Sequence, residues 1–232
     1  DRRDVVPEGD TRFFLVDDVL ATLQALAAHH RQQSRIPVVQ ITGTNGKTTT
    51  KELLSAVLSA KYSTLFTQGN LNNHIGVPRT LLRLRPEHEI AVIETGANHP
   101  GEIAFLCQMV QADCGLITNV GRAHLEGFGS FEGVMKTKGE LYDYLRRTAD
   151  KVFLNVDNPY LCRMASEREL HNDSERPDQS LVIPYGLEFS SSSVLPSSPE
   201  HPFLRIKLAS GRIVSTNLVG SYNADNVVAA IA

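Results

Sequence analysis

The sequence predicts an α/β fold, with a mostly parallel sheet, helices on both faces and an added antiparallel hairpin. From residue 38 onward, short apolar runs alternate with amphipathic stretches, which is the pattern of βαβ units. Such units make a parallel sheet, because a tight turn can join only antiparallel neighbours. Hydrophobic residues make up 41% of the 232-residue chain and charged residues 21%, so the apolar side chains suffice for a sizeable core.

The predicted elements follow one another in a regular order. Buried strands are expected at residues 38–41, 63–66, 89–94, 115–118 and 152–155. Helices that carry an apolar stripe are expected at residues 47–60, 101–111 and 131–147. A Gly/Asn-rich loop at residues 69–76 separates the second strand from the third. This alternation places a helix after most strands, as a parallel sheet covered on both faces requires.

The first part of the chain departs from this alternation. A short apolar run ends at Val16, and Asp17 can then cap a helix whose apolar residues recur at helical spacing as far as His30. The polar residues that follow lead to Pro37, so we expect them to form a linker before the sheet begins.

The last third of the chain also changes character. Residues 190–202 are rich in Ser and Pro and predict an exposed loop. Apolar and basic residues then alternate through 204–208, a Ser-Gly turn follows, and residues 213–218 return. This pattern predicts an antiparallel hairpin added to the parallel sheet. The final residues, 227–232, read as the start of a helix.

Charge and cysteine content exclude several classes of protein. Lys and Arg number 23 and Asp and Glu 26, which gives a formal net charge of −3. A protein that depended on nonspecific attraction to nucleic acid or anionic lipid would be basic, so we expect neither partner. The sequence has no apolar run of membrane-spanning length. Its three cysteines form no CxxC pair, which argues against a disulfide scaffold or zinc ribbon and fits a reducing cytoplasm.

A glycine-containing segment between the first strand and its helix predicts a phosphate-binding loop. Its sequence is TGTNGKTTT (residues 42–50), and it lies in the strand-to-helix context that such a loop requires. Backbone N–H groups and the helix N-terminus can hold phosphate oxygens, Lys47 adds a positive charge, and the Thr48 hydroxyl can bind Mg²⁺. The spacing is shorter than the standard one, because Ile41 stands where the first glycine of the usual pattern would be. This segment therefore predicts a sheet of the P-loop type.

Polar residues follow two further predicted strands. Glu94 ends the third strand, and His124 lies shortly after the fourth. Ligands of open α/β sheets bind outside the carboxyl ends of the strands, so Glu94 is a candidate Mg²⁺ ligand beside the phosphate loop. Glu94 could instead be a surface acid, and His124 could equally be structural.

A lysine lies on the apolar face of the predicted helix at residues 131–147. Lys138 falls among the apolar residues of the stripe, whereas Lys136 points toward water. Lys138 could extend its ammonium from the edge of the stripe into solvent. Alternatively, burial would lower the pKa of Lys138 and make its neutral amine reactive.

Two groups of asparagines are further candidates. Asn70, Asn72 and Asn73 in the Gly/Asn-rich loop offer amide donors and acceptors to a substrate, or they could hold their own loop in side-chain turns. In the segment GSYNADN (residues 220–226), Asn223 is well placed to cap the last helix.

Together these segments resemble the Mur ligase family, the amide-forming ligases of peptidoglycan synthesis. The resemblance runs from about residue 13 to the end of the chain and rests on the phosphate loop and the segments GNLNNHIGVP (69–78), ETGANHPGE (94–102), NVGRAHLEGFGS (119–130) and KGE (138–140). Folylpolyglutamate and cyanophycin synthetases have similar phosphate loops, but the other segments resemble the branch of the Mur family that adds D-Ala-D-Ala. Thr95 and Arg122 replace the family's usual Met and Pro, at positions that are not expected ligands.

The resemblance implies ATP and Mg²⁺ as cofactors and assigns roles to the candidate residues. The ATP-binding residues would be Gly43, Thr44, Asn45, Gly46, Lys47, Thr48 and Thr49, with Asn226 on the adenine and Asn223 in support. The ligands of two Mg²⁺ ions would be Thr48, Glu94, His124 and Lys138, the lysine after carbamylation by CO₂. The catalytic residues would be Lys47, Glu94, His124 and Lys138, and the substrate-binding residues Asn70, Asn72 and Asn73.

The implied activity is ATP-dependent joining of D-Ala-D-Ala to UDP-MurNAc-tripeptide through an acyl phosphate, by a cytoplasmic monomer. We expect residues 1–34 to be a stub and linker from a preceding substrate domain, residues 35–232 to be the central ATP-binding domain, and the family's C-terminal domain to be absent. The isolated chain would then bind ATP without efficient ligation. Two alternatives stay open, namely a related peptide or folate ligase and a nucleotide-binding fragment that is inactive by itself.

Overall fold

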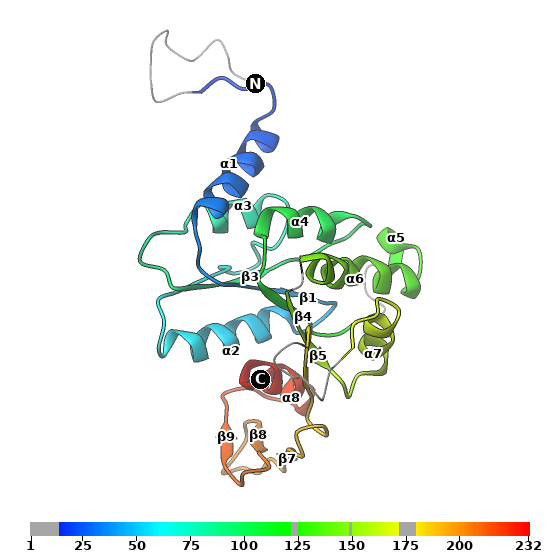
Figure 1. Ribbon diagram of the computed structural model, residues 1–232. Coiled ribbons are helices and arrows are strands. Elements are labelled where there is room, and N and C mark those ends of the chain that lie inside the picture. Colours follow the sequence, from blue (N-terminus) through cyan, green and yellow to red (C-terminus); the bar gives the residue numbers. More distant parts are fainter. Residues whose placement is uncertain (1–13, 122–124, 149, 172–179) are drawn as a thin grey trace.

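The computed structural model describes residues 14–121, 125–148, 150–171 and 180–232, and it has the predicted α/β architecture (Figure 1). Six parallel strands form the main sheet in the order β2-β3-β1-β4-β5-β6. The strands are β1 (Val38–Thr42), β2 (Thr64–Phe66), β3 (Ile90–Glu94), β4 (Cys114–Ile117), β5 (Lys151–Asn155) and β6 (Val182–Tyr185). The first five match the predicted strands to within a residue or two.

Helices cover both faces of this sheet. The helices are α1 (Val19–Gln33), α2 (Lys47–Ser59), α3 (Gly76–Leu81), α4 (Glu102–Val110), α5 (Leu125–Phe128), α6 (Phe131–Thr148), α7 (Pro159–Ser166) and α8 (Ala224–Ile231). In Figure 1, α2 and α8 lie below the sheet, whereas α3, α4, α6 and α7 lie on the other side. Among the described residues, no helix is both long and apolar enough to cross a membrane.

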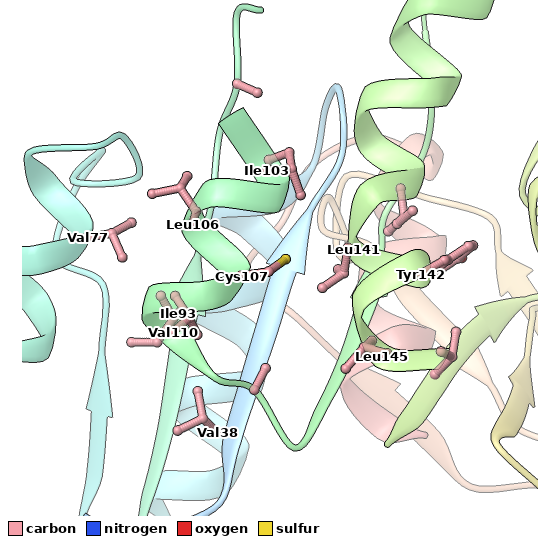
Figure 2. Packing of buried hydrophobic residues seen from close by; sticks show 14 of the residues in the cluster. Val38, Val77, Ile93, Ile103, Leu106, Cys107, Val110, Leu141, Tyr142 and Leu145 are labelled. Atoms are coloured by element: carbon pink, nitrogen blue, oxygen red, sulfur yellow. The ribbon is translucent and has the colours of Figure 1, made fainter. Parts of the chain in front are cut away.

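Strand β1 lies at the centre of the sheet and is buried along its whole length. Its successive side chains belong to different cores: Val38 packs with α4 and α6, whereas Val39 and Ile41 pack with α2 and α8. Figure 2 shows the first of these cores, in which residues of α4 and α6 face Val38 and Ile93. Leu141 of α6 is completely buried there, and burial of a leucine stabilises a fold by about 1.5–3 kcal/mol. The apolar runs therefore fix β1 between two helical layers.

Helix α1 differs from the prediction at both ends. Its N-cap is Asp18 rather than Asp17, because the Asp18 carboxylate accepts a hydrogen bond from Ala21 N. The helix continues to Gln33, so most of the polar stretch expected to be a linker is helical. Arg31 explains this continuation: its buried guanidinium donates to the carbonyls of Val110 and Gln111 and holds α1 against the end of α4.

The predicted hairpin is antiparallel, but it does not join the main sheet. Strands β8 (Arg205–Lys207) and β9 (Ile213–Ser215) pair with β7 (Ser193–Leu195) in a separate three-stranded sheet. β7 lies within the Ser/Pro-rich segment expected to be a loop. Ile206 of β8 is completely buried in the same core as α2 and α8, so side-chain packing rather than strand pairing attaches this small sheet.

Candidate active site

The candidate site lies where β1, β3 and β4 end. In the strand order, β2 and β3 lie on one side of β1 and β4, β5 and β6 on the other, so the chain reverses direction across the sheet at β1. Ligands of open α/β sheets bind at such a reversal, outside the carboxyl ends of the strands. A cleft of about 880 Å³ opens there, and its lining includes Gly43, Lys47, Asn72, Ala97 and Lys138. Segments far apart in the sequence therefore meet in one cavity.

The phosphate loop is bent by glycines that no other residue could replace without strain. Gly43 and Gly46 have φ angles of +145° and +78°. A Cβ atom on Gly43 would lie 2.1 Å from Thr118 Oγ1, and one on Gly46 would lie 2.4 Å from Asn226 Oδ1. The loop thus passes too close to its neighbours for a side chain at either position.

Residues at the end of β4 hold the loop in place. Asn119 O accepts a hydrogen bond from Thr44 N at 3.0 Å, and Asn119 Oδ1 accepts one from Asn45 N at 2.9 Å. Thr118 Oγ1 donates to Asn45 O at 2.6 Å. Thr118 and Asn119 were not among the candidate residues predicted from the sequence, although a short polar residue after an apolar strand is a usable signal.

Lys47 begins α2 beside this loop. Its Nζ donates to Thr44 O at 2.9 Å, which folds the side chain back over the loop. Partial burial lowers the pKa of Lys47, and the nearby carboxylate of Glu94 acts in the opposite direction. The ammonium therefore lies where the loop would present a bound phosphate, with one compensating charge nearby.

Glu94 is completely buried at the end of β3. Its Oε1 accepts hydrogen bonds from Thr48 Oγ1 at 3.2 Å and from Asn72 Nδ2 at 2.7 Å. Its Oε2 is buried and has no hydrogen-bond partner among the described residues. An unpaired carboxylate oxygen is costly to bury, and a hard divalent cation would satisfy it. The structure therefore brings together the hydroxyl and the carboxylate expected to bind Mg²⁺, and their chemistry fits that ion.

Lys138 is buried, as its position on the apolar stripe predicted, with 3% of its surface exposed. An ammonium extended into solvent is therefore ruled out, while Lys136 is exposed as expected. Lys138 Nζ donates to Ala97 O at 3.4 Å and lies 5.5 Å from the centre of the Phe128 ring. Burial, followed by the positive charge of Lys47, lowers the pKa of Lys138 to about 8. A substantial fraction of its amine is then neutral near physiological pH.

His124 lies outside the described residues, so its relation to Lys138 and Glu94 stays a prediction. Among the residues that the structure describes, no group of three or more His, Cys, Asp or Glu side chains could hold a metal ion. A cation in this part of the cleft would depend on the carboxylate of Glu94, the hydroxyl of Thr48 and groups that become ligands only after modification.

Glu140 is a site residue that the sequence reading missed. It lies on α6 two residues after Lys138, and its carboxylate accepts hydrogen bonds from Gly101 N at 2.8 Å and Ala104 N at 2.9 Å. These are free N–H groups at the start of α4, where a negative charge is favourable. Glu140 therefore fixes the segment that follows Ala97, and Ala97 O is the acceptor of the Lys138 hydrogen bond. The available signal was its place in the KGE segment, but its partners lie far away in sequence.

The three asparagines of the Gly/Asn-rich loop have different surroundings. Asn73 Oδ1 accepts from Ile75 N and Gly76 N, so it holds its own loop at the start of α3. Asn72 donates to Glu94, as described above. Asn70 is exposed and, like the other two, lines the cleft. Side-chain turns thus account for Asn73, whereas Asn70 keeps its amide available to a ligand.

Asn223 and Asn226 lie together beneath the phosphate loop. Asn226 Nδ2 donates to Asn223 Oδ1 at 3.0 Å, and Asn226 Oδ1 accepts from Thr50 Oγ1 at 3.1 Å. Asn223 occupies the N-cap position of α8, but its side chain donates to Val219 O and accepts from Asn226 instead of capping the helix. A role of Asn223 and Asn226 beside the adenine stays a prediction. Thr49 follows Thr48 in the first turn of α2 and is half-buried.

The chain is similar to proteins of known family and structure. The Mur ligase middle domain family matches residues 41–232. The UDP-N-acetylmuramoyl-tripeptide–D-alanyl-D-alanine ligase of Escherichia coli (strain K12) is 49% identical over 144 residues, which are 62% of this chain and 32% of that protein. The crystal structure of MurF from Acinetobacter baumannii is 33% identical with a TM-score of 0.77, covering 94% of this chain and 47% of that one.

A second solved relative is the MurF ligase from Thermotoga maritima in complex with ADP. It is 29% identical with a TM-score of 0.75, covering 97% of this chain and 51% of that one. The chain thus spans about a third to a half of the length of these relatives. The phosphate loop, Glu94 and Lys138 all lie within the matched residues. The chain therefore belongs to the Mur ligase family and contains its middle domain.

Proposed function

We propose that the protein carrying this chain is a cytoplasmic ATP-dependent ligase that joins D-Ala-D-Ala to UDP-MurNAc-tripeptide, the activity for which its similar relatives are named. Residues 35–232 are its ATP-binding domain, and residues 1–34 belong to a preceding part of the enzyme. The observation that carries the proposal is the buried carboxylate of Glu94. Its Oε1 accepts a hydrogen bond from the Thr48 hydroxyl in the phosphate loop. Its Oε2 has no hydrogen-bond partner among the described residues.

ATP binding follows from the loop and its surroundings. Backbone N–H groups of residues 43–49 and the N-terminus of α2 receive the phosphates, and Lys47 neutralises charge on the β- and γ-phosphates. Asn226, held by Thr50 and Asn223, lies against Gly46, and this place beside the phosphate loop supports a contact with the adenine. The Thermotoga maritima relative, which was solved in complex with ADP, supports nucleotide binding.

Thr48 and Glu94 would hold a Mg²⁺ ion, because a hydroxyl and a buried carboxylate are the oxygen ligands that this ion prefers. When bound, Mg²⁺ supplies charge neutralisation at the transferred phosphoryl group. His124 and a carbamylated Lys138 would hold a second ion beside the acceptor, which is the tripeptide carboxylate that receives the phosphoryl group.

The neutral amine of Lys138 supports the carbamylation. Its nitrogen can form a bond to the carbon of CO₂ and release a proton to water, which leaves a carboxylate at the end of the side chain. The pKa of about 8 keeps part of the amine unprotonated for this step, and the contact with Ala97 O holds the nitrogen at the cleft.

The reaction then has two steps. A carboxylate oxygen of the tripeptide attacks the γ-phosphorus of ATP, and ADP leaves with the electrons of the broken P–O bond. The amine of D-Ala-D-Ala attacks the carbonyl carbon of the acyl phosphate, phosphate leaves, and the amine loses a proton. Lys47 stabilises charge in the first step, while Asn70 and Asn72 help to position the acceptor from the rim of the cleft.

Phosphate release by the complete gene product tests the proposal. We expect release only when ATP, UDP-MurNAc-tripeptide and D-Ala-D-Ala are all present, with Lys47→Met inactive and the exposed Lys61→Met unchanged. Faster turnover of a folate with glutamate, or of the tripeptide with a single amino acid, would identify a different ligase. The 232-residue chain assayed alone should bind ATP without efficient turnover. Robust ligation by that chain would contradict the proposal that it is only the ATP-binding part of the enzyme.

A further inference from the structure

We propose that Lys51 is a positioning residue for the acceptor side of the cleft. Its buried ammonium holds the segment of residues 67–76, and that segment in turn places Asn72 against Glu94. Binding of the acceptor, UDP-MurNAc-tripeptide, therefore depends on Lys51, whereas nucleotide binding does not. The kinetic part of this inference rests on the proposed ligase function, whereas the structural part does not.

Lys51 is completely buried although it carries a charge. It lies one helical turn after Lys47 on α2, and its Nζ donates to Thr67 O at 2.8 Å, with Gly69 O at 3.5 Å. The ammonium also pairs with Glu52 Oε1 at 2.6 Å. A buried ammonium is costly unless its donors are satisfied, and two carbonyls and a carboxylate satisfy them here.

The carbonyls that Lys51 holds belong to the start of the Gly/Asn-rich loop. Thr67 is completely buried, and its hydroxyl accepts a hydrogen bond from Glu94 N at 3.0 Å. Further along, Asn72 Nδ2 donates to Glu94 Oε1, and Asn72 O accepts from Gly96 N at 2.7 Å. The segment is thus bound at Thr67 and at Asn72 to the end of β3, which carries Glu94, and Lys51 links its start to α2.

Helix α2 consequently presents two lysines with different partners. Lys47 folds over the phosphate loop, whereas Lys51 reaches the end of β2 on the acceptor side. A neutral side chain at position 51 would leave the Thr67 carbonyl without its charged donor in a dry environment. The loop would then loosen while the glycines, Lys47 and Asn226, which form the nucleotide side, keep their own contacts.

Three measurements on Lys51→Met in the complete gene product test the inference. We expect amide hydrogen exchange in residues 68–76 to be at least tenfold faster, with exchange in β1 and β4 unchanged. We expect the KM for UDP-MurNAc-tripeptide to rise about tenfold, or about 1.4 kcal/mol, while the Kd for fluorescent ADP stays within twofold. Lys61→Met, at an exposed position just after the end of α2, should match the wild type in all three.

Lys51→Arg keeps the charge and the long stem, and it should give the same pattern with a smaller amplitude. If Lys51→Met fails to fold, the same comparisons of hydrogen exchange, KM and Kd with the wild type are made on Lys51→Arg, and they decide. Uniformly faster exchange, or equal losses of nucleotide and acceptor binding, would reduce Lys51 to a general structural residue. Wild-type exchange and KM in both variants would also overturn the inference. A wild-type enzyme that does not use the acceptor would refute the proposed function, but the exchange measurement would still decide the role of Lys51.

Discussion

Replacing Gly46 by alanine tests the close approach of the phosphate loop to Asn226. Gly46 has φ +78°, and an added Cβ would lie 2.4 Å from Asn226 Oδ1. The left-handed backbone costs an L-residue about 1–2 kcal/mol. Displacement of Asn226 would also break its hydrogen bonds with Thr50 and Asn223, each worth about 1 kcal/mol. We therefore expect Gly46→Ala to lose about 3–4 kcal/mol of unfolding free energy and to bind ADP at least tenfold more weakly, a change of about 1.4 kcal/mol.

Gly211→Ala is the matched control, because Gly211 has φ +81° but no atom of the described residues lies within 4 Å of its Cβ position. It should lose only the backbone contribution of about 1–2 kcal/mol and bind ADP like the wild type. Urea unfolding and titration with a fluorescent ADP measure the two quantities on each variant. Equal losses of stability in the two variants, or wild-type ADP affinity in Gly46→Ala, would refute the role assigned to the contact with Asn226.

Three further predictions concern charged groups around the cleft. Glu94→Gln should abolish the strengthening of ADP binding by Mg²⁺ while leaving Mg²⁺-free affinity within about twofold by titration; an intact Mg²⁺ effect would remove Glu94 from the metal site. Because burial lowers the Lys138 pKa from 10.5 to about 8, the unfolded chain binds more protons between these values. The unfolding free energy of the wild type, relative to Lys138→Met, should therefore rise by up to about 3 kcal/mol from pH 7.5 to pH 10.5; a flat difference in urea unfolding would contradict the burial of its charge. Glu140→Ala should cost about 1–3 kcal/mol, because two N–H groups at the start of α4 lose their acceptor. The exposed ion-pair variant Glu132→Ala should cost under about 1 kcal/mol, and equal melting temperatures would argue against capping of α4 by Glu140.

The longest apolar patterns were sufficient to predict the main elements of the fold. β1 is apolar except for Gln40 and Thr42, β3 is apolar up to Glu94, and α6 has a clear helical stripe, so local sequence and final burial agree. The missed elements include α3, α7 and β6, which are short and each contain a proline, at Pro78, Pro159 and Pro184. Tertiary packing rather than propensity maintains such elements, and β6 can hold a proline because it is the edge strand of the sheet.

The candidate site divides in a similar way. Lys47, Thr48 and Glu94 could be predicted because strand ends of a parallel sheet meet at one edge, and Lys138 because a lysine stood out on an apolar stripe. The contacts of Glu140 and Lys51 could not be predicted, since each acts on backbone groups that are remote in sequence and carry no residue-specific signal. Asn73 shows the converse, because its side chain satisfies its own loop, as short polar side chains commonly do.

By itself, the sequence determined the α/β class, the phosphate loop and the resemblance to the Mur ligase family, because periodicity and short motifs are written in neighbouring residues. The folded structure was needed to show that one buried oxygen of Glu94 has no partner among the described residues, that Asn226 lies against Gly46, and that the hairpin forms its own sheet. These features depend on distances between segments that are far apart in the chain, and such distances are set by packing across the whole sheet rather than by local pattern.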